Sequence, residues 1–224
     1  MKGKIKAIIF DLDYTLYDMD QYLDQAYPFV AKSVCELNKV EYQKCLECLT
    51  TCCSKYGRLH DKLFNFWLGS MDLLSDENLE NAIEAFHGFQ INKLYPYDGL
   101  ISTLQNLKQK YKLGIITDGK VQTQKNKVKC LDLIKYFDQI TYTDLLNTSK
   151  PDPYCFTYTL GKMAVSPKEV IFVGDHPIKD IKGAVESNLR AIRIVNGAFS
   201  KMADEVGCEP ETRIDQIEEL LMYV

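Results

Sequence analysis

The stretch AIIFDLDYT, residues 7–15, has the pattern of a short buried strand that ends in two acidic residues. Four apolar residues run directly into Asp11, and Asp13 follows one residue later. In a strand, side chains two residues apart point to the same side. Two carboxylates at the end of a buried strand repel one another and lose their hydration. The pair therefore indicates a chemical role at the carboxyl end of this strand.

Composition and charge describe an ordinary globular chain. Its 224 residues are 46% hydrophobic and 26% charged, enough for one core or a core with a smaller module. The formal net charge of −4 suggests no broad basic surface, so we expect no nucleic-acid partner. No apolar run approaches the roughly 20 residues of a membrane span, and the apolar start stops at aspartates, unlike a signal peptide. We therefore expect no membrane partner and a cytoplasmic location.

The chain has eight cysteines, which a reducing cytosol keeps as free thiols. Three of them, Cys45, Cys48 and Cys52, have the spacing of one helical stripe. Core packing is the expected reading, and a zinc or redox cluster is the alternative. A zinc site needs a second ligand pair such as another CxxC, and the sequence offers none.

Two kinds of pattern divide the chain. Residues 4–11 predict a buried strand, whereas residues 20–93 show apolar residues every three to four positions and predict helices only. Beyond them, predicted strands alternate with predicted helices; the strands are 111–119, 137–144, 169–175 and 189–195, and the helices are 100–110, 121–136, 150–165, 178–187 and 215–223. This alternation predicts an α/β fold, with a Rossmann-like, doubly wound parallel sheet covered on both faces and an inserted all-helical module.

Polar residues stand at the carboxyl ends of the first four predicted strands. The second strand ends in Thr117, Asp118 and Gly119. The third is followed by Lys150. The fourth ends at Asp175, with Asp180 five residues later. Ligands of open α/β sheets bind outside the carboxyl ends of the strands, so these groups should meet at one edge. Carboxylates can share such an edge if Mg²⁺ neutralises them.

Four short segments resemble the motifs of the haloacid dehalogenase superfamily, in the same order; they are DLDYT, IITDG, SKPDP and VGDHPIKD. The resemblance covers essentially the whole chain. It implies a core domain of residues 1–16 and 94–224. It also implies that residues 17–93 form a helical cap domain, of the kind inserted between the first and second motifs.

The resemblance also implies residue roles. Asp11 would be the nucleophile that forms an aspartyl-phosphate, and Asp13 the general acid and then the general base. Mg²⁺ would be held by Asp11, the backbone carbonyl of Asp13 and Asp175, with Asp180 supporting through water or Lys150. Phosphate would be bound by Leu12, Thr117, Asp118, Gly119 and Lys150. Many relatives have Asn where this chain has Asp118.

The expected function is a Mg²⁺-dependent phosphatase acting on a small organic phosphate, as a monomer or homodimer. Asp13 favours phosphate esters over carbon–halogen bonds, because a departing halide needs no proton. Two alternatives stay open: a sugar phosphomutase of the same superfamily, and a non-catalytic binding or regulatory protein that retains the site.

Overall fold

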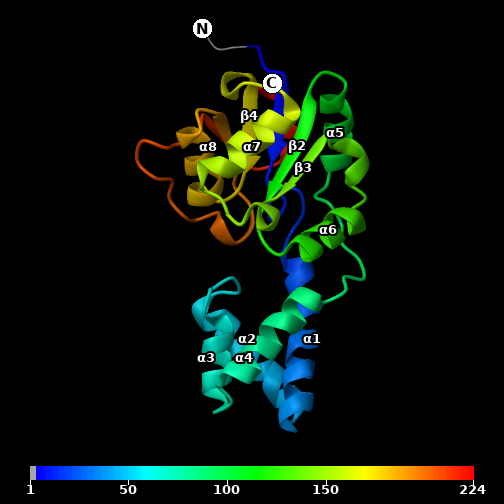
Figure 1. The fold of residues 1–224 in the computed structure, drawn as a ribbon, viewed down its shortest axis with the longest axis vertical. Helices are drawn as coiled ribbons and strands as arrows, with labels where there is room; N and C mark the ends of the chain where they lie inside the picture. Colours follow the sequence, from blue (N-terminus) through cyan, green and yellow to red (C-terminus); the bar gives the residue numbers. More distant parts are fainter. Residues whose placement is uncertain (1–3) are drawn as a thin grey trace. The chain divides into compact units, whose positions relative to one another are not determined.

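The computed structural model describes residues 4–224, which form two compact units (Figure 1). The α/β unit contains the chain up to Met19 together with Lys93–Val224. The helical unit is Asp20–Asn92.

The α/β unit is built on one sheet of six parallel strands in the order β3-β2-β1-β4-β5-β6. The strands are β1 (Ala7–Phe10), β2 (Lys112–Thr117), β3 (Gln139–Tyr142), β4 (Val170–Gly174), β5 (Arg190–Ile194) and β6 (Thr212–Ile214). The predicted α/β fold with a parallel sheet is confirmed. The last strand was not predicted, because three residues with a charged centre are too short to show a strand pattern.

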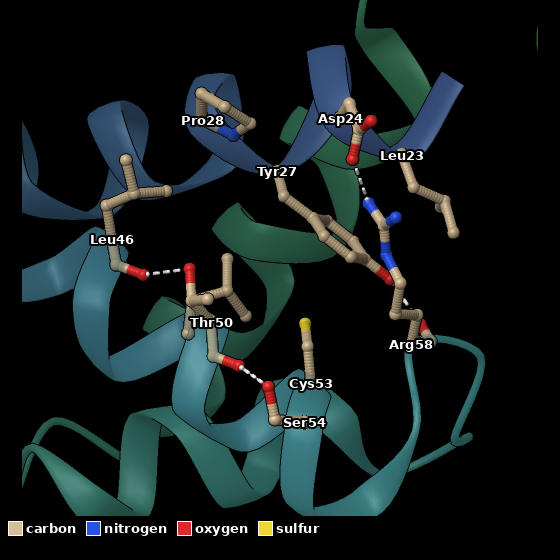
Figure 2. Close-up of a pocket in the computed structure, with 10 residues that line it drawn as sticks. Leu23, Asp24, Tyr27, Pro28, Leu46, Thr50, Cys53, Ser54 and Arg58 are labelled. Atoms are coloured by element: carbon tan, nitrogen blue, oxygen red, sulfur yellow. Dashed lines mark hydrogen bonds and ion pairs between the residues drawn. The ribbon is translucent and has the colours of Figure 1, made fainter. Parts of the chain in front are cut away.

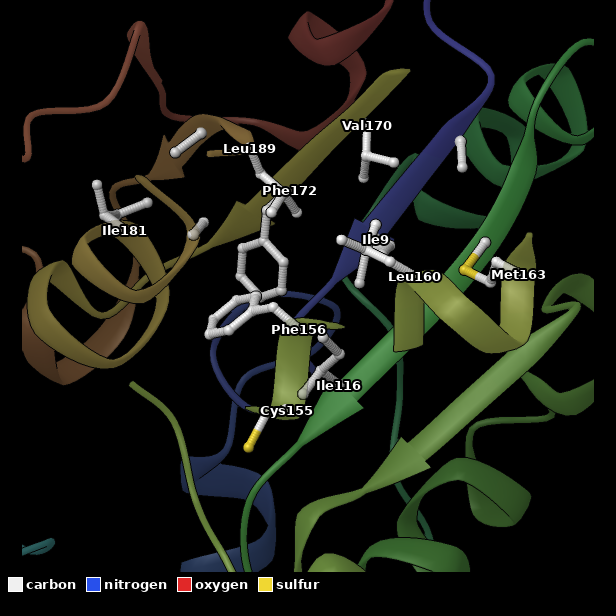
Figure 3. Packing of buried hydrophobic residues seen from close by; sticks show 13 residues of the cluster. Ile9, Ile116, Cys155, Phe156, Leu160, Met163, Val170, Phe172, Ile181 and Leu189 are labelled. Carbon is white, nitrogen blue, oxygen red and sulfur yellow. The ribbon is translucent and has the colours of Figure 1, made fainter. Parts of the chain in front are cut away.

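Strand β1 lies in the middle of the sheet, between β2 and β4. All four of its residues are fully buried, as expected for a strand covered on both faces. On one face, Phe156 of α7 packs edge-on against Phe172 of β4, with 5.2 Å between ring centroids (Figure 3). The same cluster includes Ile9 and Ile181. This packing buries one face of β1 and β4, whose register is set by their parallel pairing.

The helices of the α/β unit are α5 (Leu100–Lys108), α6 (Val121–Cys130), α7 (Pro153–Met163), the π-helix Pro177–Lys182 and α8 (Gly183–Glu186). Two predictions need correction. The helix expected over 121–136 ends at Cys130, because Asp132 adopts a left-handed conformation; a 3₁₀ turn follows at Ile134–Tyr136. The helix expected over 215–223 is the 3₁₀ helix Ile217–Met222, a winding that apolar spacing does not distinguish from α.

The helical unit consists of α1 (Asp20–Asn38), α2 (Tyr42–Tyr56), α3 (Leu63–Ser70) and α4 (Asp76–Gly88). Helix α1 packs against α2 and α4. Trp67 is fully buried, and its Nε1 donates to the carbonyl of Cys45 at 3.0 Å. Across residues 4–224, none of the helices combines the length and apolar character that crossing a bilayer requires.

Candidate active site

The side chains predicted from the strand ends lie at the carboxyl edge of the sheet. Asp11 directly follows β1, and its backbone N–H donates to the carbonyl of Val173 on β4 at 2.9 Å. Asp175 directly follows β4. Lys150 lies in the connection between β3 and α7. Because β1 and β4 are adjacent and parallel, Asp11 and Asp175 emerge side by side.

Asp11, Asp175 and Asp180 form a cluster in which one oxygen from each carboxylate lies within 4.8 Å of the others. It is the only grouping in the described chain with the donors and spacing for a metal ion. All three residues are buried. Lys150, also buried, donates its Nζ to Asp11 Oδ1 at 2.5 Å and to Asp180 Oδ1 at 2.6 Å.

The cluster has more negative charge than its lysine can balance. Three carboxylates and one ammonium leave a formal charge of −2. Burial, and then the nearby carboxylate of Asp180, raise the pKa of Asp11 to about 7 against the pull of Lys150. Burial and the carboxylates of Asp180 and Asp11 raise the pKa of Asp175 well above its usual range. Asp175 Oδ2 is buried and has no hydrogen-bond partner among the described residues. Oxygen donors, charge and an unpartnered oxygen together fit a divalent cation.

Asp180 reaches the cluster because the chain folds tightly after β4. It lies in the π-helix Pro177–Lys182, and its Oδ2 accepts from the backbone N–H of His176 at 3.0 Å. A Cβ on Gly174 would lie 2.5 Å from the Cβ of Asp180, so only glycine leaves room there. His176 caps the π-helix: its Nδ1 accepts from the N–H groups of Ile178 and Lys179.

The carboxylate of Asp13 points to a different set of partners. Lys127 Nζ donates to Oδ1 at 2.7 Å, and Tyr17 Oη donates to the same oxygen at 2.5 Å. Gln124 Nε2 donates to Oδ2 at 2.9 Å. Burial alone would raise the pKa of Asp13, but the ammonium of Lys127 and these hydrogen bonds lower it instead. Asp13 is therefore held as a carboxylate by three donors.

The remaining predicted phosphate-binding residues lie after β1 and at the end of β2. Leu12 and Thr117 are fully buried, and Thr117 Oγ1 accepts from Gln124 Nε2 at 2.5 Å. Asp118 Oδ1 accepts from Thr143 Oγ1 at 2.9 Å and from the backbone N–H of Lys150 at 3.1 Å. Asp118 thus anchors the loop that carries Lys150. Gly119 has a φ of +105°, which favours glycine.

The sequence pattern did not reveal several residues that contact this site. Tyr17, Gln124 and Lys127 surround Asp13, and Arg193 of β5 donates its Nε to the backbone carbonyl of Asp175 at 3.0 Å. Gln124 and Lys127 stand three residues apart in a polar helix, a spacing that places them on one face. A lysine on a polar helix is expected to be solvent-exposed, and only the fold shows that Lys127 is buried.

The helical unit contains a cavity of 480 Å³ (Figure 2). Its lining comes from α1, α2 and Arg58; the residues are Leu23, Asp24, Tyr27, Pro28, Leu46, Leu49, Thr50, Cys53, Ser54 and Arg58. The guanidinium of Arg58 pairs with Asp24 at 2.7 Å and with Asp20 at 3.0 Å. Burial raises the pKa of the Cys53 thiol to about 11, so this thiol is protonated near neutrality.

The cysteines predicted to share one helical stripe lie on α2. Cys45 and Cys52 are buried, whereas Cys48 is half-buried and lies 2.9 Å from Ser70 Oγ. All eight cysteines of the chain are free. Cys45 and Cys52 are among the buried residues of the helical unit, and Cys52 Sγ lies 3.8 Å from Ser70 Oγ.

Comparison with known proteins places the chain in one family. The family model of haloacid dehalogenase-like hydrolases matches residues 8–194. A glyceraldehyde 3-phosphate phosphatase of Methanocaldococcus jannaschii is 31% identical over 207 residues, covering 90% of each chain. Its counterpart in Methanopyrus kandleri is 28% identical, covering 98% of this chain and 97% of its own. The crystal structure of a phosphatase of the same family from Thermococcus onnurineus aligns with a TM-score of 0.69 at 27% identity, over 98% and 97% of the two chains. The chain belongs to the haloacid dehalogenase-like hydrolase family.

Proposed function

We propose that this protein is a Mg²⁺-dependent phosphatase that hydrolyses a small phosphate monoester through an aspartyl-phosphate on Asp11. The observation that carries the proposal is the buried Asp11–Asp175–Asp180 cluster with Lys150 in contact with two of its members. Burying three carboxylates together is costly, so their retention favours a site that works with a cation. The activities for which the relatives are named support phosphate esters as the substrate class.

In the first step of the proposed reaction, a carboxylate oxygen of Asp11 attacks phosphorus and the bond to the ester oxygen breaks. Asp13 is a carboxylate in the free protein, and the negative charge of the bound substrate phosphate favours its uptake of a proton from solvent. This proton then passes to the departing alkoxide, which leaves as an alcohol. Lys150 offsets the charge that Asp11 and the phosphoryl group share. Thr117 and the backbone amides near Leu12, Asp118 and Gly119 hydrogen-bond the phosphoryl oxygens.

In the second step, Asp13 accepts a proton from a water molecule as that water attacks the phosphorus of the aspartyl-phosphate. The bond between phosphorus and the Asp11 oxygen breaks, which releases inorganic phosphate and restores both aspartates. The proton that Asp13 loses to the alcohol in the first step is replaced in the second by one from the attacking water, so the two steps together balance.

The ligands proposed for Mg²⁺ are the carboxylates of Asp11 and Asp175 and the backbone carbonyl of Asp13, with Asp180 supporting. When bound, the ion supplies positive charge that cancels the repulsion between an anionic nucleophile and an anionic phosphate. The formal charge of −2 on the cluster with its lysine suits a divalent ion.

We further propose that the helical unit, Asp20–Asn92, acts as a cap domain that excludes water during the first step. Glyceraldehyde 3-phosphate is the first substrate to test, because two relatives at 28–31% identity are named for it. We keep a cytoplasmic location as our prediction, with all eight cysteines free.

The test is phosphate release from a panel of metabolite phosphates, with Mg²⁺ and with EDTA, beginning with glyceraldehyde 3-phosphate. We expect turnover of at least one member that requires Mg²⁺ and disappears in Asp11→Asn. Turnover that persists in Asp11→Asn contradicts the assigned nucleophile. An isomerised sugar phosphate without free phosphate indicates a phosphomutase instead. No turnover of any member, together with tight binding of a partner, indicates a non-catalytic protein.

A further inference from the structure

We infer that Lys127 and Gln124 of α6 are positioning residues that hold the Asp13 carboxylate in the orientation from which it exchanges protons with the leaving group. The inference rests on the proposed function, because it takes Asp13 as the general acid. Both side chains contact Asp13 itself, and neither lies in any of the four sequence motifs.

Both oxygens of Asp13 are engaged from the same helix. Lys127 Nζ contacts Oδ1 at 2.7 Å, and Gln124 Nε2 contacts Oδ2 at 2.9 Å. Because the two oxygens are bound separately, the plane of the carboxylate is set and not only its position. Tyr17 Oη adds a third contact, on Oδ1 at 2.5 Å, from the segment that follows β1.

The burial of Lys127 argues that this contact is more than a surface ion pair. Its side chain is 3% exposed, and that of Asp13 is 19% exposed. Burying an ammonium is costly unless it is paired, and replacing such a pair by apolar residues is often neutral for stability. The buried residues of α6 are Thr123, Gln124, Lys127 and Val128, so the helix turns a largely polar face inward. A buried polar face is expected for a helix that contributes side chains to a polar site.

Gln124 links Asp13 to the phosphate-binding side of the site. Its Nε2 carries two hydrogens, and the structure pairs this nitrogen with Asp13 Oδ2 and with Thr117 Oγ1, the latter at 2.5 Å. The hydroxyl of Thr117 is thus an acceptor toward Gln124, which directs its own hydrogen away from that amide. One amide therefore orients a proton-transfer group and a phosphate-binding group together.

Loss of the positioning contacts should lower kcat/KM, which reports the first step, most where the leaving group needs a proton. Phenyl phosphate and 4-nitrophenyl phosphate have nearly the same shape, but 4-nitrophenolate departs readily without protonation. A merely structural defect lowers kcat/KM for both esters by the same factor. A misplaced acid lowers kcat/KM for phenyl phosphate by a larger factor.

The experiment measures kcat/KM for both esters with Mg²⁺ in the wild type, Lys127→Met and Gln124→Met. We expect each variant to lose about tenfold more activity on phenyl phosphate than on 4-nitrophenyl phosphate, a part of the roughly 10²- to 10⁴-fold that a general acid contributes. Lys127→Arg, which keeps a charged donor, should restore part of the wild-type ratio. Lys129→Met is the matched control, because it makes the same change at an exposed position of the same helix.

The outcomes separate the two proposals. Equal losses on both esters in Lys127→Met and Gln124→Met overturn the positioning role and leave the phosphatase function standing. A wild type that hydrolyses no phosphate ester overturns the proposed function and the inference with it. Should Lys127→Met fail to fold, the ester ratio of Gln124→Met decides, because this neutral replacement leaves the Lys127–Asp13 pair in place.

Discussion

Asp11 and Asp13 lie two residues apart and each contacts a buried lysine, Asp11 at 2.5 Å and Asp13 at 2.7 Å. Their surroundings nevertheless differ. Asp11 shares Lys150 with Asp180 and lies beside Asp175, whereas Asp13 receives Lys127 and two neutral donors. Burial therefore prevails at Asp11 and raises its pKa to about 7, while the donors prevail at Asp13 and lower its pKa. The whole balance of surrounding charge, rather than the nearest partner, sets the state of a buried carboxylate.

Replacement of Asp11 should have the greatest effect on activity. Asp11→Asn removes the proposed nucleophile, so turnover with Mg²⁺ should fall by about 10⁴-fold or more. The same change removes one charge from a crowded cluster while Lys150 keeps Asp180. The melting temperature in EDTA should therefore stay the same or rise. Turnover within tenfold of the wild type would be incompatible with the nucleophile role.

Asp13→Asn should lower both stability and activity, whereas Asp11→Asn should lower activity alone. It leaves the buried ammonium of Lys127 without its carboxylate, which should lower the free energy of unfolding by about 3 kcal/mol. Turnover of phenyl phosphate should fall by about 10²- to 10⁴-fold, with a smaller loss on 4-nitrophenyl phosphate.

Urea unfolding and steady-state kinetics measure these two effects of Asp13→Asn. Asp132→Asn is the control, because the Asp132 side chain is 78% exposed and pairs with a surface lysine. An Asp13→Asn variant as stable as this control would show that Lys127 does not depend on Asp13.

Gly174→Ala disturbs the cluster of Asp11, Asp175 and Asp180 and leaves the partners of Asp13 in place. The added Cβ would meet the Cβ of Asp180 at 2.5 Å, so Asp180 must move away from Lys150 and its neighbours. We expect a loss of about 1–3 kcal/mol in the free energy of unfolding, as for other overpacked sites, and weaker Mg²⁺ activation. Gly161→Ala is the control, since a Cβ there meets no atom within 4 Å. Equal Mg²⁺ activation in the two variants would contradict the role assigned to Asp180.

The smallest expected effect is the pH dependence of stabilisation by Mg²⁺. The pKa of Asp11 is raised from 3.8 to about 7 in the folded protein without metal. The contribution of this group to stability is therefore complete below pH 3.8 and is lost as the pH rises through 7. Mg²⁺ needs the deprotonated carboxylates, so it should offset this loss.

Thermal unfolding with Mg²⁺ and with EDTA, at equal ionic strength, measures this effect. The increase in melting temperature caused by Mg²⁺ should be small at pH 5 and grow toward pH 8, where saturating Mg²⁺ contributes about 1–3 kcal/mol. An increase that is the same at both pH values would argue against metal binding by the raised-pKa carboxylates.

Local sequence patterns were enough to predict the central strands and their polar ends. The apolar run of β1, followed by Asp11, predicts a buried strand with a polar end, and the alternation of strands and helices predicts the parallel sheet. Topology then brings Asp11 and Asp175 together, because β1 and β4 are neighbours. Helix boundaries were less predictable: Asp132 ends α6 through its backbone conformation, which the apolar pattern does not encode.

The side chains around Asp13 lay beyond sequence reasoning. Gln124 and Lys127 are more than 100 positions from Asp13, on a helix whose composition is typical of a solvated surface. No periodicity distinguishes a lysine that faces water from one that faces a buried carboxylate. The same holds for Asp118, whose side chain supports the Lys150 loop instead of remaining a stray charge beside the site.

Residue order and apolar spacing alone predicted five of the six strands, the polar carboxyl ends of the first four and the family resemblance, because these are local patterns of burial and charge. Only the tertiary structure decided which charges balance one another: Asp11 with a crowded cluster, Asp13 with Lys127. The physical reason is that electrostatic interactions depend on distance and burial in space, and separation along the chain carries neither.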